Sequence, residues 1–259
     1  MTLHDDDQLA HDLAEAAGQR LLALRQARGD GSAASLRRDG DRQSHEFLAA
    51  RLALMRPDDA LLSEEGKDDP ARLSASRVWI VDPLDGTREF GEPGRTDWAV
   101  HVALWELGEL TAGAVALPAQ GRILSTANLR GTPATAATPA APAHRLRLLV
   151  SRSRPPALAE ALGQRLGAEL VPLGSAGAKA AAVIAGEADA YVHSGGQYEW
   201  DSAAPVAVAQ AAGLHASRID GSKLEYNQAD PSLPDILICP AVLAGMLLEA
   251  ISSVRTPAM

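Results

Sequence analysis

Residues 78–87 read VWIVDPLDGT, an apolar run that ends in two aspartates three positions apart. The Val, Trp and Ile residues predict a buried strand, and the proline and glycine that follow are typical of a turn. Two carboxylates and one backbone carbonyl are oxygen ligands that suit a hard cation such as Mg²⁺. We therefore predict a metal site at Asp82, Asp85 and the Leu84 carbonyl. A capped turn without a metal is the alternative.

The residues after this turn suggest an anion site beside the metal. If a helix begins at Gly86, Thr87 and Arg88, its first N–H groups have no partner within the helix and point toward any negative group in front of them. The metal ligands and the phosphate-binding groups would then come from one turn of chain.

Two further acidic motifs lie far from the first one along the chain. Residues 63–65 read SEE after a predicted strand, and residues 199–201 read EWD before an Ala-rich segment that predicts a helix. Taken singly, the acidic pair fits a solvated surface, and Asp201 fits a helix N-cap. Taken together, the motifs supply the carboxylates that a two-metal phosphoryl-transfer site requires.

The hydrophobic pattern of the first half predicts helices followed by strands. Two amphipathic helices occupy the first 60 residues, the second ending at Pro57. The predicted strands of this half are Ala60–Leu62, Val78–Val81, Trp98–Trp105, Ala112–Leu117 and Ile123–Ser125.

In the second half, predicted strands alternate with predicted helices, which indicates a layered α/β arrangement. The predicted strands are Leu146–Val150, Glu169–Leu173, Ala190–His193 and Ile236–Cys239. The predicted helices are Ala157–Leu166, Ala178–Ala185, Ser202–Ala212 and Ala241–Ser252. A proline-rich stretch, residues 131–143, predicts a linker or surface loop. We therefore expect an N-terminal part, residues 1–140, with a helix pair and an antiparallel sheet, and a C-terminal α/β part, residues 141–259.

Composition and charge exclude several classes of function. The 259 residues contain 24 Lys and Arg against 33 Asp and Glu, which argues against a nucleic-acid or anionic membrane surface. The single cysteine, Cys239, rules out an internal disulfide and fits a buried core position in a reducing compartment. No apolar run is long enough for a membrane span, and the first residues do not resemble a signal peptide. We expect a cytoplasmic protein.

The three acidic motifs resemble, in order and spacing, the signature of the lithium-sensitive, Mg²⁺-dependent phosphomonoesterases of the inositol monophosphatase superfamily. Four further stretches resemble the CysQ-type 3′(2′),5′-bisphosphate nucleotidases of actinobacteria: residues 82–90, 98–101, 174–179 and 199–205. The resemblance covers nearly the whole chain. It implies a fold of the α+β or α/β class, a layered αβαβα sandwich, with the C-terminal part carrying Asp201 and substrate specificity.

The resemblance also implies metal positions. Glu64, Asp82 and the Leu84 carbonyl would hold a first Mg²⁺, and Asp82, Asp85 and Asp201 would hold a second. A loosely bound third ion would contact Glu64, and Li⁺ would inhibit by occupying the second position.

A threonine paired with an aspartate helps to deprotonate the attacking water in this family. Thr87 matches that threonine and Asp41 matches the aspartate, so with Glu64 they form the expected catalytic set. An N-cap at the start of a helix is the alternative role for Asp41.

Substrate-binding residues follow from the same resemblance. They are Gly86, Thr87, Arg88, Ser151, Arg152, Gly177, Ala178 and Lys179. Lys179 would neutralise a second substrate phosphate, and a solvent-facing lysine is the alternative. Residues 151–154 read SRSR where the nucleotidases commonly have Ser-Arg-Ser-His, so Arg154 replaces a histidine and the contact of that imidazole is in doubt.

The function that the resemblance implies is hydrolysis of the 3′-phosphate of 3′-phosphoadenosine 5′-phosphate to give adenosine 5′-phosphate, a step that recycles a by-product of sulfate assimilation. An inositol monophosphatase or a fructose 1,6-bisphosphatase with the same metal site is the first alternative. A catalytically silent bisphosphate sensor is the second. The expected partner is a small phosphorylated substrate rather than a nucleic-acid polymer or a membrane, and a homodimer stays open.

Overall fold

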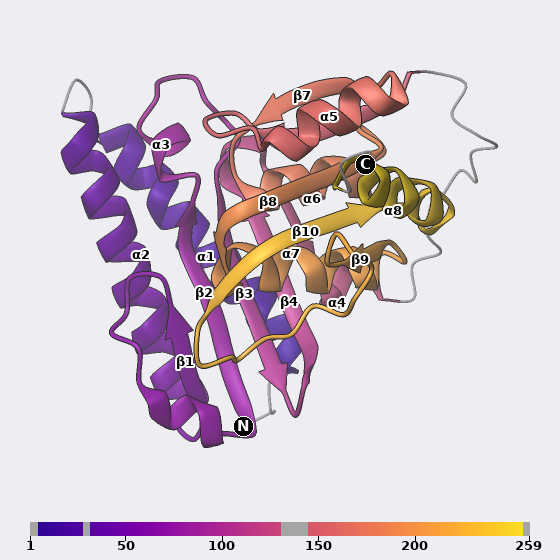
Figure 1. Ribbon diagram of the computed structural model, residues 1–259. Coiled ribbons are helices and arrows are strands. Elements are labelled where there is room, and N and C mark those ends of the chain that lie inside the picture. Colours follow the sequence, from indigo (N-terminus) through magenta and orange to yellow (C-terminus); the bar gives the residue numbers. More distant parts are fainter. Residues whose placement is uncertain (1–4, 28–31, 131–144, 256–259) are drawn as a thin grey trace.

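Helix layers and two five-stranded sheets alternate in the computed structural model, which describes residues 5–27, 32–130 and 145–255 (Figure 1). The order of layers is helix pair, first sheet, central helix pair, second sheet and outer helix pair. The predicted αβαβα sandwich is therefore confirmed.

The first sheet has the order β1-β2-β3-β4-β5. Its strands are β1 Ala60–Ser63, β2 Arg77–Asp85, β3 Ala99–Glu106, β4 Glu109–Leu117 and β5 Arg122–Ser125. The strands after β2 pair antiparallel, as predicted, whereas β1 pairs parallel with β2. Helices α1, Asp6–Ala27, and α2, Ala33–Met55, pack against this sheet on the face away from the second sheet (Figure 1).

The second sheet has the order β7-β6-β8-β10-β9. Its strands are β6 Arg147–Ser151, β7 Glu169–Leu173, β8 Ala190–Tyr198, β9 His215–Ser217 and β10 Ser232–Cys239. Strand β6 pairs parallel with both β7 and β8, and β10 pairs antiparallel with β8 and β9. The carboxyl ends of β6, β7 and β8 therefore lie at one edge of the sheet, where ligands commonly bind in α/β folds.

Two Ala-rich helices, α6 Ala176–Ile184 and α7 Glu199–Ala211, contact both sheets and fill the space between them. Helices α5, Ala157–Leu166, and α8, Ala241–Arg255, pack together on the outer face of the second sheet. Short helices occupy the connections: α3 Thr87–Phe90, α4 Thr126–Leu129, and 3₁₀ turns at Pro70–Ser74 and Pro118–Gln120.

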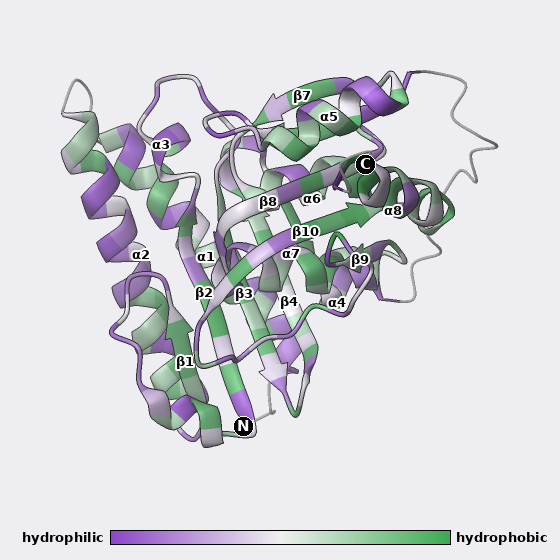
Figure 2. Ribbon diagram, viewed as in Figure 1, coloured by the Kyte–Doolittle hydropathy of each residue, from purple (hydrophilic) through white to green (hydrophobic). Residues whose placement is uncertain are grey.

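Hydropathy follows the layers. Figure 2 shows hydrophobic residues along β2, β3 and β10, and a mixture of hydrophobic and hydrophilic residues along α2. The largest hydrophobic cluster joins residues of both sheets with those of α6 and α7, including Val115, Val208 and Ile236. Cys239 is buried, as expected. Among the described helices, none combines the length and apolar character needed to cross a bilayer.

Most predicted elements are present, with three differences that matter for the site. Strand β2 continues through Asp85, so the DPLD motif lies inside the strand rather than in a turn after it. Helix α7 begins at Glu199, so Asp201 is its third residue. Helix α2 begins at Ala33, which places Asp41 two turns inside the helix and shows that the N-cap interpretation was wrong. Strand β9 was not predicted.

The predicted loop at residues 131–143 and the predicted boundary between residues 140 and 141 lie outside the described residues. The division of the chain into two parts stays a prediction.

Close packing between α7 and β4 generates a stability prediction. A Cβ placed on Gly113 of β4 would lie 2.5 Å from the Cβ of Ala207, so an added methyl group has no room. We expect Gly113→Ala to lower the free energy of unfolding by about 1–3 kcal/mol through overpacking, measured by urea denaturation. The matched control is Gly245 in α8, where nothing lies within 4 Å of an added Cβ. Gly245→Ala should raise stability by up to about 1 kcal/mol, and equal effects at the two positions would contradict this account of the packing.

Candidate active site

A β-bulge in β2 brings two aspartates to the same side of the strand. Asp82 pairs with His101 and Asp85 with Ala99, so three steps along β2 match two steps along β3. Residues three apart in a regular strand point to opposite faces, and the extra residue removes that alternation. The Ser44 hydroxyl of α2 donates to the Pro83 carbonyl at 2.7 Å and fixes the bulge from the helix side.

Asp201 completes a group of three carboxylates. Ligand oxygens of Asp82, Asp85 and Asp201 all lie within 4.8 Å of one another. Asp201 reaches this place from the first turn of α7, where its Oδ2 accepts the N–H of Tyr198 at 2.7 Å. The neighbouring Trp200 ring stacks on the Tyr198 ring with centroids 4.8 Å apart.

Two hydrogen-bond donors and a nearby histidine surround one oxygen of Asp85. Its Oδ2 accepts from the Ser175 hydroxyl at 2.6 Å and from the Gly177 N–H at 2.9 Å, and it lies 3.1 Å from His101 Nε2. Burial opposes ionisation, but His101 and these neighbours outweigh it and lower the pKa of Asp85 to about 2. Asp85 is therefore an anchored anion whose Oδ1 stays available to a cation.

His101 connects two of the acidic groups. It is fully buried on β3, with Nδ1 3.2 Å from the Trp200 carbonyl and Nε2 facing Asp85. Both neighbours are acceptors, so the ring lies between an oxygen of the second part of the site and one of the first sheet. A Cβ on Gly177 would lie 2.3 Å from Nε2, which explains a glycine at that position. Sequence analysis missed His101 because its role depends on the pairing of β3 with β2.

The remaining carboxylates repel one another. Burial and the charges of Glu64 and Asp85 raise the pKa of Asp82 well above its usual range. Burial and the charge of Asp85 raise the pKa of Asp201 to about 6. Partial burial and the charge of Asp201 raise the pKa of Glu64 to about 7. Glu64 follows β1 and reaches solvent at the edge of the group. A multivalent cation would relieve this repulsion, and carboxylate oxygens suit a hard one.

A threonine–aspartate pair lies next to the carboxylates. Thr87 Oγ1 is 3.2 Å from Asp41 Oδ1 and 3.0 Å from the Leu84 carbonyl oxygen. Burial and repulsion by Glu65 raise the pKa of Asp41 to about 6. Helix α2 supplies Asp41 and β2 runs directly into Thr87, so the pair forms only in the folded chain.

The predicted substrate-binding residues differ in their exposure and in whether their hydrogen-bond donors already have partners within the protein. Gly86 has a φ of +83°, and a Cβ added there would lie 3.1 Å from the Asp97 carbonyl oxygen. It precedes the single turn of α3, which carries the exposed Arg88. The N–H of Gly177 donates to Asp85, and that of Ala178 donates to the Ser175 hydroxyl, so these two donors already have partners.

Arg152, in the segment after β6, binds two glutamates that follow β2 in the first half of the chain. The Arg152 guanidinium donates to Glu89 at 2.9 Å and to Glu92 at 2.8 Å, and the Ser151 hydroxyl accepts the N–H of Arg154. Both predicted residues therefore have partners within the protein.

Lys179 is buried, with 4% of its surface exposed, so the solvent-facing alternative is wrong. Its ammonium donates to the Ser175 carbonyl at 2.7 Å and to the Gly174 carbonyl at 3.0 Å, and it lies 3.4 Å from the Leu173 carbonyl. Burial lowers its pKa to about 8, against the pull of Asp85 and Asp201. Lys179 contributes positive charge beside the acidic group, while its donors stay with the backbone.

Ser175 is a second site residue that sequence analysis missed. Its φ of +43° is rare for a residue with a side chain, and its hydroxyl both caps α6 and holds Asp85. Strain of this kind is typical of functional sites. The glycines around it gave the only sequence signal.

The comparisons with known proteins agree with this fold. The model of the inositol monophosphatase family matches residues 3–255. A protein of Mycobacterium leprae named 3′-phosphoadenosine 5′-phosphate phosphatase is 51% identical, covering 96% of this chain and 94% of its own. A protein of Mycobacterium tuberculosis with the same name is 53% identical, covering 91% and 89%.

A solved structure, CysQ from Bacteroides thetaiotaomicron, is similar to the whole fold. It has a TM-score of 0.72 and 27% sequence identity, covering 91% of this chain and 97% of its own. Since the family match extends from the first helix to the last, and relatives match about half of all positions, the chain belongs to the inositol monophosphatase family.

Proposed function

We propose that this protein is a phosphomonoesterase that hydrolyses the 3′-phosphate of 3′-phosphoadenosine 5′-phosphate, giving adenosine 5′-phosphate and inorganic phosphate. The observation that carries the proposal is the group of three carboxylates within 4.8 Å, next to the Thr87–Asp41 pair. Relatives at 51% and 53% identity whose printed name is 3′-phosphoadenosine 5′-phosphate phosphatase support the choice of substrate.

We assign Mg²⁺ to the acidic group because the ligand atoms of Asp82, Asp85 and Asp201 are carboxylate oxygens whose repulsion favours a small divalent ion. Glu64, Asp82 and the Leu84 carbonyl would hold one ion, Asp82, Asp85 and Asp201 a second, and Glu64 a loosely held third. When bound, the ions withdraw charge from the phosphate oxygens and acidify the attacking water. Li⁺ would inhibit by taking the second position.

Thr87 and Asp41 are the proposed acceptors for the proton of the attacking water. The Thr87 hydroxyl, beside the ionised Asp41, can accept a hydrogen bond from water while donating its own proton to Asp41. Gly86 and Arg88 lie beside this pair and are the proposed contacts of the reacting phosphate. The Lys179 charge, fixed behind Asp85, offsets part of the negative charge that substrate adds.

A comparison of substrates tests the function. Purified protein is assayed for phosphate release from 3′-phosphoadenosine 5′-phosphate, inositol 1-phosphate and fructose 1,6-bisphosphate, with Mg²⁺ and with EDTA. We expect kcat/KM for the nucleotide to exceed the others by at least tenfold, about 1.4 kcal/mol in transition-state stabilisation. A tenfold preference for either sugar phosphate would overturn the assignment. Mg²⁺-dependent binding without turnover would favour a bisphosphate sensor.

Metal binding should release protons. Glu64, Asp82 and Asp201 have raised pKa values, so at pH 6.5 they still bind protons that must leave when a cation takes their oxygens. Calorimetric titration with Mg²⁺ in buffers of different ionisation enthalpy should show release of about one proton or more per protein. The affinity should rise with pH through the pKa values of about 6 and 7.

The control for proton release removes one carboxylate. Asp201→Asn should lower both the Mg²⁺ affinity and the number of protons released, whereas Asp220→Asn, at an exposed position, should change neither. Heats that do not depend on the buffer, or a pH-independent affinity, would contradict the assignment of these carboxylates to the cation.

Substitutions at the Thr87–Asp41 pair should slow turnover more than they weaken metal binding. We expect Thr87→Ala and Asp41→Asn to lower kcat by on the order of 10²-fold, because each removes a positioned proton acceptor. Thr87→Ser keeps the hydroxyl and should retain most activity. Mg²⁺ titration of each variant is the control, and a large loss of metal affinity in Thr87→Ala would reassign that residue to the metal site.

A cytoplasmic location, a role in sulfur metabolism and a homodimer remain predictions that accompany this function.

A further inference from the structure

The EWD motif contains a buried carboxylate, Glu199, that the proposed reaction does not use. Glu199 is 1% exposed and is the first residue of α7, of which Asp201 is the third. Its Oε2 accepts the N–H of Asn227 at 2.6 Å, and its Oε1 accepts the N–H of Gln228 at 2.7 Å. The carboxylate therefore fixes a short stretch of backbone against the start of α7.

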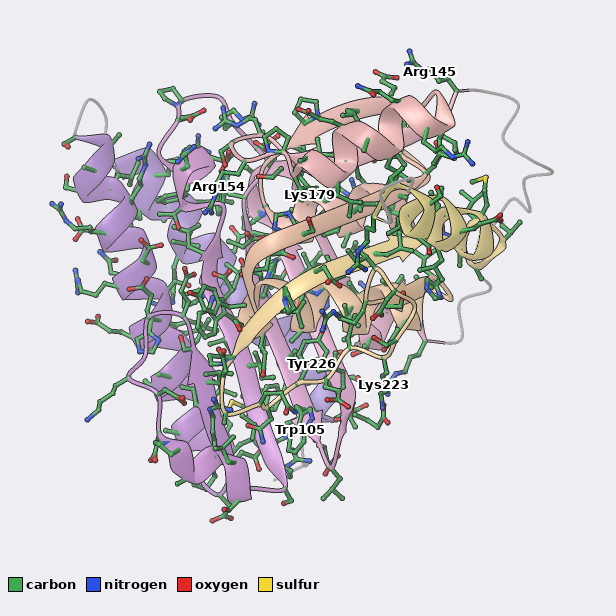
Figure 3. All side chains as sticks on the ribbon, viewed as in Figure 1. Trp105, Arg145, Arg154, Lys179, Lys223 and Tyr226 are labelled. Atoms are coloured by element: carbon green, nitrogen blue, oxygen red, sulfur yellow. The ribbon has the colours of Figure 1, made fainter. Side chains whose placement is uncertain are left out.

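This stretch of backbone belongs to residues 218–231, the segment between β9 and β10, which we call the strap. Figure 3 shows Lys223 and Tyr226 on the strap, in the lower half of the view. Lys223 pairs with Glu109 of β4, and the Tyr226 hydroxyl lies 3.2 Å from the Ser202 hydroxyl of α7. The strap thus contacts the first sheet as well as the central helix layer.

A buried arginine binds the same stretch from the other side. Arg72, 1% exposed, belongs to the 3₁₀ turn Pro70–Ser74, which lies between β1 and β2. Its Nη1 donates to the side-chain oxygen of Asn227 at 2.8 Å, and its Nη2 donates to the Gln228 carbonyl at 2.9 Å. The Asn227 side-chain amide donates in return to the Arg72 carbonyl at 3.1 Å. Two residues of the strap are therefore held between Arg72 and Glu199.

The backbone conformation of Asn227 permits this double contact. Its φ of +60° is uncommon for a residue with a side chain, although asparagine adopts it more readily than most. The backbone N–H then bonds Glu199 while the side chain bonds Arg72. All three residues are buried, so breaking one of these bonds leaves a buried polar group without its partner.

Both sides of this contact continue directly into the candidate active site. Glu199 shares the first turn of α7 with Asp201, whose Oδ2 accepts the N–H of Tyr198. Arg72 lies in the connection from β1 to β2 that begins with Glu64. The contact thus joins two segments, one from each half of the chain, whose carboxylates lie at the site.

We infer that Arg72 and Glu199 are positioning residues, which hold Asp201 in place for the cation by fixing the strap between them. The inference rests on the proposed function, because it requires that Asp201 take part in binding Mg²⁺. Groups that orient a metal ligand contribute to metal affinity without touching the metal. Loosening the contact should therefore weaken Mg²⁺ binding and leave the chemical step at saturating Mg²⁺ nearly intact.

Calorimetric titration with Mg²⁺ tests the inference without turnover. Glu199→Gln keeps the shape of the side chain but turns an NH₂ group toward one of the two backbone N–H donors. We expect its Mg²⁺ affinity to fall by on the order of 10-fold. In activity assays, the Mg²⁺ concentration for half-maximal turnover should rise by the same factor, with kcat at saturating Mg²⁺ within about threefold of the wild type.

Asp235 of β10 provides a matched control at the other end of the strap. Its buried carboxylate accepts from Arg218 at 2.7 and 2.9 Å and from the N–H of Ile219 at 2.9 Å. Asp235→Asn should lower the midpoint of urea denaturation and leave the Mg²⁺ affinity unchanged. Equal losses of Mg²⁺ affinity in Asp235→Asn and Glu199→Gln would overturn the inference, because a general loosening of the fold would then explain both.

Asn227→Gly provides a milder variant in case Glu199→Gln does not fold. Glycine adopts a φ of +60° readily, so this change removes only the side-chain bonds to Arg72. We expect a smaller loss of Mg²⁺ affinity and, in the metal-free protein, faster hydrogen exchange of the amides in the first turn of α7. Wild-type affinity together with wild-type exchange would contradict the positioning role.

A double variant separates the inference from the proposed function. Adding Glu199→Gln to Asp201→Asn should weaken Mg²⁺ binding little further, because both changes act through one carboxylate; fully additive losses would overturn the inference. If Asp201→Asn weakens Mg²⁺ binding and Glu199→Gln does not, only the positioning role fails. If Asp201→Asn binds Mg²⁺ as tightly as the wild type, the proposed metal site fails and the inference fails with it.

Discussion

The contacts of Asp85 Oδ2 are the interaction on which the site depends. This oxygen lies in the first sheet, its two hydrogen-bond donors come from α6 and the loop before α6, and His101 of β3 lies 3.1 Å away. One carboxylate thus ties the segment after β7 to the bulge of β2. Because His101, Lys179 and two hydrogen bonds compensate its charge, the pKa of Asp85 is lowered, whereas the pKa values of Asp82, Glu64 and Asp201 are raised. A cation bound there, as proposed, would meet one fixed anion and several carboxylates that ionise as it binds.

Local sequence was sufficient for most elements and for the acidic motifs. The apolar and turn residues around 78–87 predicted the strand, and the motifs named Asp82, Asp85 and Asp201, whose ligand oxygens lie within 4.8 Å of one another. What failed was local geometry that depends on distant partners. The bulge of β2 needs the register with β3, and the burial of Lys179 needs the packing of α6 between the two sheets. Sequence spacing carries neither piece of information.

His101 and Ser175 show the same limit for function. Each side chain alone has an ordinary structural interpretation, a histidine on an apolar strand and a serine at a helix N-cap. Their roles appear only when β3 and the start of α6 meet at Asp85. A resemblance to a family could name the acidic residues by motif, but residues that orient those carboxylates have no motif of their own. They were found from contacts.

The low aromatic content and the Ala-rich helices follow from this arrangement. A single helix layer separates the two sheets, and it must be thin for Asp201 and Ser175 to reach the bulge of β2. At Gly113 an added Cβ would lie 2.5 Å from that of Ala207, and at Gly177 an added Cβ would collide with His101. Larger side chains in α6 or α7 would move the sheets apart and separate the carboxylates. The composition that fills the core with Ala and Gly therefore also sets the distances within the group of three carboxylates.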